Sequence, residues 1–79
     1  MMEAHKARMF NEYWEVKTRY EKLHRMLIKQ EAGTLNFPLS CPVELLKEQK
    51  FHMGMYLHCL EVRAEIEGVD LFSKTIEEG

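Results

Sequence analysis

Residues 9–27 of the chain, MFNEYWEVKTRYEKLHRML, carry the pattern that decides the fold. Apolar side chains recur there at spacings of four, three, four, three and four residues, at Met9, Tyr13, Val16, Tyr20, Leu23 and Leu27. On an α-helix these positions form one continuous apolar stripe along a long rod, and such a stripe must be buried against a partner. The sequence therefore predicts a long amphipathic helix that packs against another part of the molecule.

A second apolar stripe of similar length supplies that partner. It follows a segment rich in turn residues, and its members are Leu46, Met53, Leu57, Leu60 and Ala64. Two long helices joined by a short connection pack as an antiparallel hairpin. We expect an all-α fold with one domain over residues 1–79, made of a helix over about 3–32, a loop over 33–41, a helix over about 42–67 and a tail over 68–79.

Glycine and proline mark the ends of both predicted helices. Gly33 and Gly68 stand where a left-handed residue ends a helix. Pro42 is favoured in the first turn of the second helix, because its missing N–H would be unpaired there. The tail carries apolar residues that could dock it on the hairpin as a last turn or small helix, namely Val69, Leu71, Phe72 and Ile76.

Several large apolar residues fall outside both stripes, namely Phe10, Trp14, Ile28 and Phe51. A lone two-helix hairpin of 79 residues buries little surface, and exposed groups of this size are unusual in a monomer. The sequence therefore predicts that copies of the hairpin assemble into a helical homo-oligomer, with Trp14 as an anchor between copies.

Composition and charge narrow the class of protein. The net charge is −2, and no apolar run approaches the length of a membrane span. Residues 1–32 contain seven Lys/Arg and five Glu, whereas residues 40–79 contain four Lys/Arg and eight Asp/Glu. This balance argues against binding to DNA or RNA but leaves room for focused cations that hold a small phosphate ligand. With no visible secretory signal, we expect a cytoplasmic protein without contact to a membrane.

The sequence shows no constellation for catalysis, a metal ion or a cofactor. His52 and His58 are six residues apart and so lie on different helix faces, unlike a helical metal pair. Cys41 and Cys59 are expected to be free thiols, with Cys59 buried as a small hydrophobe. We therefore expect that the protein is not an enzyme.

Two features of the second helix interrupt its apolar pattern. Gln49 and Arg63 continue the stripe with polar groups, so Arg63 pairs with a Glu of the neighbouring helix or contacts an anion. Gly54 lies inside the helix, where glycine is unfavourable, which indicates the close approach of another helix or of a ligand.

The order of residues in both helices resembles that of the phage anti-CBASS and anti-Thoeris nucleotide sponges, together with their crAss-phage-type relatives. The resemblance covers residues 9–66 and rests on Asn11-Glu12-Tyr13, Lys22-Leu23, Leu45-Leu46, Gln49, Met53, Tyr56-Leu57, Leu60 and Arg63. It implies a compact helical homo-oligomer, often a hexamer, in the host cell cytoplasm. Such proteins sequester cyclic nucleotide immune messengers in pockets between protomers and do not cleave them.

The resemblance also implies site residues. The aromatic residue of the first helix corresponds to Tyr13 and the arginine of the second to Arg63. The lysine corresponds to Lys29, but the family spacing from Tyr13 falls on Ile28, so either the register shifts by one residue or this contact is absent. Thr34 stands where a polar loop residue could meet phosphate. The ligand class stays open between cyclic dinucleotides, cyclic trinucleotides and cyclic ADP-ribose isomers. A helical module that inhibits or bridges a host or phage protein is the alternative function.

Overall fold

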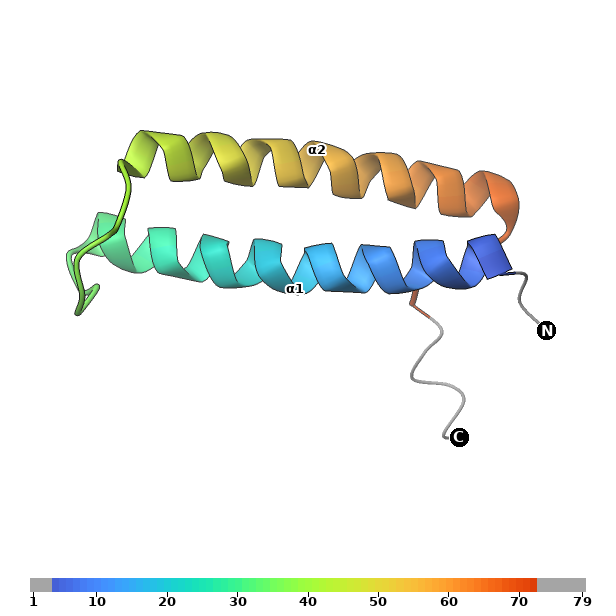
Figure 1. Ribbon diagram of the computed structural model, residues 1–79, viewed down its shortest axis with the longest axis horizontal. Helices are drawn as coiled ribbons and strands as arrows, with labels where there is room; N and C mark the ends of the chain where they lie inside the picture. The colour runs from blue at the N-terminus through green and yellow to red at the C-terminus, as the bar shows by residue number, and fades with distance from the viewer. Residues whose placement is uncertain (1–3, 73–79) are drawn as a thin grey trace.

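The computed structural model describes residues 4–72 of the chain. It consists of two helices, α1 (Ala4–Ala32) and α2 (Val43–Glu67), which run antiparallel side by side (Figure 1). Residues 4–72 contain no β-strand. The predicted all-α hairpin is therefore confirmed.

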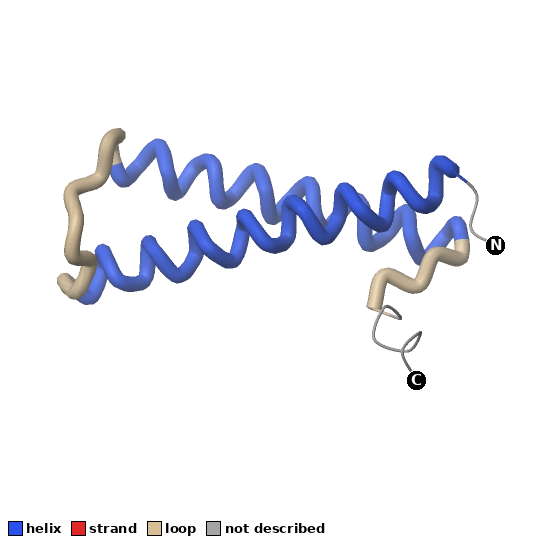
Figure 2. The backbone as a smooth tube through the Cα atoms, turned by 60° about the horizontal axis from the view of Figure 1, so that its bottom comes forward, coloured by secondary structure: helices blue, strands red, loops and turns tan. Residues whose placement is uncertain are grey.

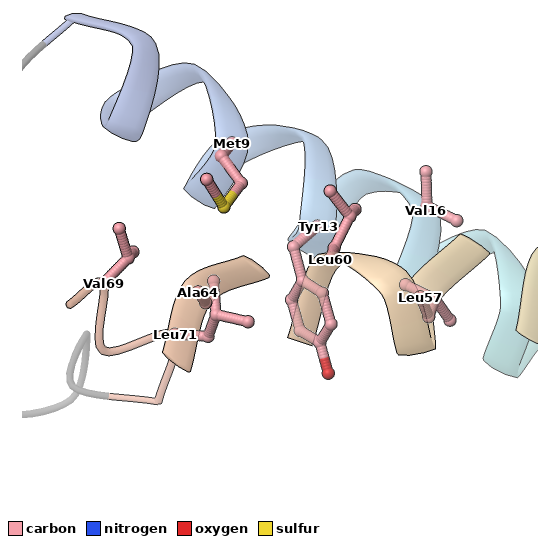
Figure 3. Packing of buried hydrophobic residues seen from close by; sticks show 8 residues of the cluster. All are labelled: Met9, Tyr13, Val16, Leu57, Leu60, Ala64, Val69 and Leu71. Carbon is pink, nitrogen blue, oxygen red and sulfur yellow. The ribbon is translucent and has the colours of Figure 1, made fainter. Parts of the chain in front are cut away.

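The two predicted apolar stripes meet in the core of the hairpin. Of the α1 stripe, five members are buried and Tyr20 is half-buried. In α2, Leu57, Leu60 and Ala64 are buried, whereas Leu46 and Met53 are half-buried. The main cluster gathers in the half of the hairpin that lies away from the loop, and its members are Met9, Tyr13, Val16, Leu57, Leu60, Ala64, Val69 and Leu71 (Figure 3). The largest cluster of buried residues thus lies away from the loop.

Both helices end at glycines in the left-handed conformation, as predicted. Gly33 has φ 79°, and there the N–H groups of Gly33 and Thr34 donate to the carbonyls of Gln30 and Lys29 at 3.2 and 2.8 Å. Gly68 has φ 75° and ends α2. A side chain at either position would strain the backbone, which is why glycine ends these helices.

The start of α2 differs from the sequence-based expectation. Pro42 is the N-cap residue and lies just outside the first turn, with an extended ψ of 141°. The carbonyl of Pro42 accepts hydrogen bonds from the N–H groups of Leu45 and Leu46 at 3.1 and 3.3 Å. The helix therefore begins at Val43, because Pro42 contributes only its carbonyl to the first turn.

The segment after α2 turns back along the hairpin (Figure 2). Val69 and Leu71 are buried in the core cluster, which confirms that this part of the tail docks. The indole Nε1 of Trp14 donates to the carbonyl of Leu71 at 2.8 Å. We expected Trp14 to anchor contacts between copies. In the structure, the tail of the same chain accepts the hydrogen bond from the indole and partly covers Trp14, so a contact with another copy is not needed to explain this residue. Ile76 lies outside the described residues.

Gly54 marks a close approach between the two helices. A Cβ atom built on Gly54 would lie 3.4 Å from Cε1 of Tyr20 in α1. The ring of Tyr20 thus packs over the backbone of α2, so the expected close neighbour is the other helix.

The outer surface of the hairpin keeps several large apolar groups exposed. Phe51 and Ile28 are among them, as predicted, whereas Phe10 is half-buried. Cys59 is exposed, so the expectation of a buried thiol was wrong. It fails because Cys59 falls on the side of α2 opposite Leu57, Leu60 and Ala64, which face α1.

Candidate functional site

The four predicted site residues lie in two separate groups. Tyr13 contacts Glu61 and lies with Arg63 in the half of the hairpin near the chain ends, whereas Lys29 and Thr34 lie at the loop. The sixteen residues of helix from Tyr13 to Lys29 span about 24 Å. A single chain therefore does not bring all four residues around one small ligand.

Tyr13 is part of the core. Its side chain is 0% exposed, and its hydroxyl donates to Oε2 of Glu61 on α2 at 2.7 Å. Burial, followed by the hydrogen bond and the charge of Glu61, raises the pKa of Tyr13 well above its usual range. The ring also packs edge-on against Trp14, with 5.1 Å between centroids. Tyr13 thus ties the two helices together, and its contact with a ligand stays a prediction.

Arg63 is exposed and forms an ion pair within its own helix. Its Nε and Nη2 donate to Oε2 of Glu67 at 3.2 and 3.1 Å. We expected Arg63 either to contact an anion or to pair with a Glu of the neighbouring helix. The observed partner, Glu67, lies on the same helix instead. Residues four apart on a helix are neighbours, which makes Glu67 the closer carboxylate. Such an exposed pair is weak, and the guanidinium remains available to a stronger anion.

Lys29 and Thr34 are joined by the end of α1. The backbone N–H of Thr34 donates to the carbonyl of Lys29 at 2.8 Å, and the Thr34 hydroxyl lies 3.4 Å from the same oxygen. Lys29 stands in the last turn, where a cation is also favoured by the helix dipole. These contacts fix the position of both residues relative to the loop.

A groove with a cationic rim lies next to Lys29, between the outer side of α1 and the loop. Its volume is about 240 Å³, and its lining residues are Lys22, Arg25, Met26, Lys29, Leu35 and Phe37. We call it the loop-end groove. The three cations follow spacings of three and four, which place them on one face of α1. Phe37 adds an aromatic ring that is 52% exposed.

The cations of the loop-end groove are not neutralised. Within residues 4–72, Lys22, Arg25 and Lys29 form no ion pair, and no carboxylate lines the groove. The cations of the preceding turns differ, because Lys17 and Arg19 pair with Glu21 and Glu15 at 3.6 and 3.7 Å. Positive potential is therefore concentrated at the loop end of α1.

Of the predicted site residues, only Lys29 lines this groove. Sequence reasoning missed Lys22, Arg25 and Phe37. The sequence does indicate that Lys22 and Lys29 are unpaired, because neither has an acidic residue three or four positions away on the helix. Phe37 carried no such signal, because its position depends on the path of the loop.

A larger groove of about 430 Å³ lies between the helices around Tyr20. Lys50 lies there with its Nζ 5.7 Å from the centre of the Tyr20 ring, and the ring of His24 is nearly parallel to that of Tyr20. Glu31 also lines this groove, and its carboxylate opposes an anionic ligand. The loop-end groove is the better anion site for this reason.

Other kinds of site are not evident in the part of the chain that the structure describes. Among residues 4–72, no cluster of three or more His, Cys, Asp or Glu is placed to hold a metal ion. Neither of the two described helices is long and apolar enough to cross a membrane. Within residues 4–72, the loop-end groove with its cationic rim is therefore the candidate site.

Comparison with known families shows which family the chain belongs to. The model of the Sequestin family matches residues 3–66, which is most of the chain. The chain therefore belongs to the Sequestin family, the family of phage anti-CBASS and anti-Thoeris cyclic nucleotide sponges, and the resemblance described above is confirmed. No curated protein and no solved structure matches the chain. Family membership supports a general role in sequestering cyclic nucleotides, and the family is not one of enzymes by name.

Proposed function

We propose that this chain is a phage anti-defence protein that sequesters cyclic nucleotide immune messengers at interfaces between protomers, in the host cell cytoplasm, without degrading them. The observation that carries the proposal is the loop-end groove, where Lys22, Arg25 and Lys29 remain unneutralised beside the exposed ring of Phe37. The guanidinium of Arg25 suits phosphate oxygens, and the aromatic ring suits a base.

The size of the groove supports a pocket shared between copies. A volume of about 240 Å³ lies below the range of about 300–1,000 Å³ that encloses a small ligand. A second protomer of a homo-oligomer, which we propose to be a hexamer, would complete the enclosure. In that arrangement Lys29 and Thr34 come from one protomer, and Tyr13 and Arg63 from another.

The proposed contact residues differ in how easily their side chains can reach a ligand. Lys29 and Arg63 have exposed side chains and reach a ligand by a change of rotamer. Tyr13 is fully buried in the single chain, so a contact through its ring requires the docked tail to move. We therefore expect Arg25 and Lys29 to dominate affinity.

Calorimetry tests the proposal with a panel of cyclic dinucleotides, cyclic trinucleotides and cyclic ADP-ribose isomers. We expect at least one compound to bind with a dissociation constant below tens of micromolar, and to weaken as salt screens the cations. Arg25→Ala combined with Lys29→Ala should weaken binding at least tenfold. Lys17→Ala combined with Arg19→Ala is the matched control, since these cations of the same helix are already paired.

The fate of the ligand distinguishes a sponge from an enzyme. The bound messenger should be recovered intact after the protein is denatured, and chromatography of the released ligand measures this. A linear product would contradict sequestration without degradation. Absence of binding by every compound of the panel would overturn the proposed function.

A second candidate function is a protein-interaction module, favoured by the exposed Phe51, Met55 and Ile66 of α2. Such a module would bind no nucleotide. A purified chain that remains monomeric and captures one protein in stoichiometric amount would favour this function over the sponge.

A further inference from the structure

Residues 69–72, which we call the docked tail, combine a buried part with an exposed one. Val69 and Leu71 are 7% and 3% exposed and belong to the core cluster (Figure 3). Phe72 differs, because its side chain is 60% exposed although it lies next to that core. Phe72 can therefore leave its position while Val69 and Leu71 stay buried.

The ring of Phe72 packs against two aromatic residues of α1. It is nearly perpendicular to the rings of Tyr13 and Trp14, at 82° and 87°, with 6.0 and 5.8 Å between centroids. Tyr13 and Trp14 are themselves in edge contact at 5.1 Å. Aromatic rings attract one another in this geometry. The three rings form one cluster, and Phe72 is among the groups that separate the fully buried Tyr13 from solvent.

A turn within the docked tail holds Phe72 in this position. Gly68 ends α2 with φ 75°, and the N–H of Val69 donates to the carbonyl of Ala64 at 2.8 Å. The N–H of Phe72 then donates to Oδ1 of Asp70 at 3.1 Å. An aspartate that accepts from the N–H two residues further on forms a local turn. The chain itself thus directs Phe72 toward α1.

We propose that Phe72 competes with a nucleobase for Tyr13, so that the docked tail regulates the aromatic part of the ligand site. This inference rests on the proposed function, in which Tyr13 contacts the ligand. A base gains affinity by contact with aromatic rings, and Phe72 already makes ring contacts to the same residue. The base and Phe72 cannot occupy that side of Tyr13 together. Binding of the base therefore requires Phe72 to leave.

This competition lowers the observed affinity of the ligand. When only a fraction of the chains is competent to bind, the apparent dissociation constant rises by the inverse of that fraction. The competent chains are here those in which Phe72 is displaced. The rest of the docked tail is held more firmly, because Leu71 is buried and its carbonyl accepts the indole N–H of Trp14 at 2.8 Å. Displacement of Phe72 alone is the smaller change.

Calorimetry and stopped-flow kinetics of Phe72→Ala test the proposal, with the panel of cyclic dinucleotides, cyclic trinucleotides and cyclic ADP-ribose isomers. Each compound that binds the wild-type chain should bind Phe72→Ala about three- to tenfold more tightly, the factor that ring pairs of this kind contribute. The gain should lie in the association rate constant. The dissociation rate constant should stay unchanged, because Phe72 is displaced in the bound state of the wild-type chain.

Phe72→Tyr is the matched control, since it keeps the ring and should keep the wild-type affinity. Phe72→Ala should retain the wild-type circular dichroism spectrum, because Val69 and Leu71 still fill the core.

Amide hydrogen exchange followed by NMR gives a readout that a merely structural role of Phe72 would not change. In the wild-type chain, a bound compound should speed up exchange of the Phe72 N–H, which the turn with Asp70 holds in the free protein. Exchange of the Val69 N–H, bonded to the carbonyl of Ala64, should stay as slow as before. Unchanged or slower exchange at Phe72 would show that it stays in place and would overturn the proposal.

The affinities separate this inference from the proposed function. Equal affinity of the wild-type chain and Phe72→Ala would exclude the competition and leave sequestration intact. Absence of binding to either chain would overturn both. Binding to Phe72→Ala alone would support the competition in its strongest form.

Discussion

Replacement of Gly54 by alanine should stabilise the protein. Gly54 lies in the middle of α2, where glycine is less favourable than alanine by about 0.5–1 kcal/mol. The new Cβ would lie 3.4 Å from Cε1, 3.8 Å from Cζ and 3.7 Å from the hydroxyl oxygen of Tyr20. These are ordinary van der Waals distances to the far end of a side chain, so the methyl group fits with little adjustment. The gain in helix propensity therefore outweighs the steric cost.

Thermal unfolding followed by circular dichroism measures this effect. A change of 1 kcal/mol shifts the midpoint of a domain of this size by about 4–8 °C, so Gly54→Ala should raise it by about 2–8 °C. All variants should be compared at one protomer concentration, because assembly makes the midpoint depend on concentration. Gly54→Leu is the control and should lower the midpoint, since its longer side chain meets the Tyr20 ring. A lower midpoint for Gly54→Ala would refute the reasoning and show that the two helices tolerate no added atom there.

Three further predictions concern the core and the surface. Tyr13→Phe removes the donor to Glu61 and should lower the free energy of unfolding by about 1–2 kcal/mol in urea at pH 7. Burial raises the pKa of Tyr13 in the folded protein. The stabilisation that depends on its neutral hydroxyl should therefore be fully present below about pH 10 and be lost as the pH rises above that value. Tyr13→Phe should remove this loss of stability at alkaline pH. Leu60→Ala should cost about 2–5 kcal/mol, enough to unfold much of the protein in the same assay. Arg63→Ala should change stability by less than about 0.5 kcal/mol while lowering nucleotide affinity in calorimetry, because its pair with Glu67 is exposed.

The fold could be predicted because the sequence repeats one physical signal many times. The stripe from Met9 to Leu27 spans about five turns, so a single half-buried member such as Tyr20 does not obscure it. Gly33 and Gly68 added independent evidence for the helix ends. Pro42 was misplaced by one position, since proline suits both the first turn and the residue before it.

The candidate site could be predicted only in part, because it depends on which face of a helix each residue occupies and on the path of the loop. An aromatic residue at a stripe position fits either a core or a ligand surface, and the structure shows that Tyr13 belongs to the core. Lys29 was predicted as a ligand contact, but its neighbours Lys22 and Arg25 were not, although Lys22 has no acidic residue three or four positions away on the helix. Arg25 has Glu21 four residues before it, and only the structure shows that Glu21 pairs with Lys17 instead.

The hydrogen bond from Trp14 to the carbonyl of Leu71 gives the protein a built-in spectroscopic reporter. Trp14 is the single tryptophan of the chain, so its emission arises from one environment. Detachment of the tail would expose the indole to water and shift that emission to longer wavelength. Tail movement on ligand binding can therefore be followed by intrinsic fluorescence, without a label.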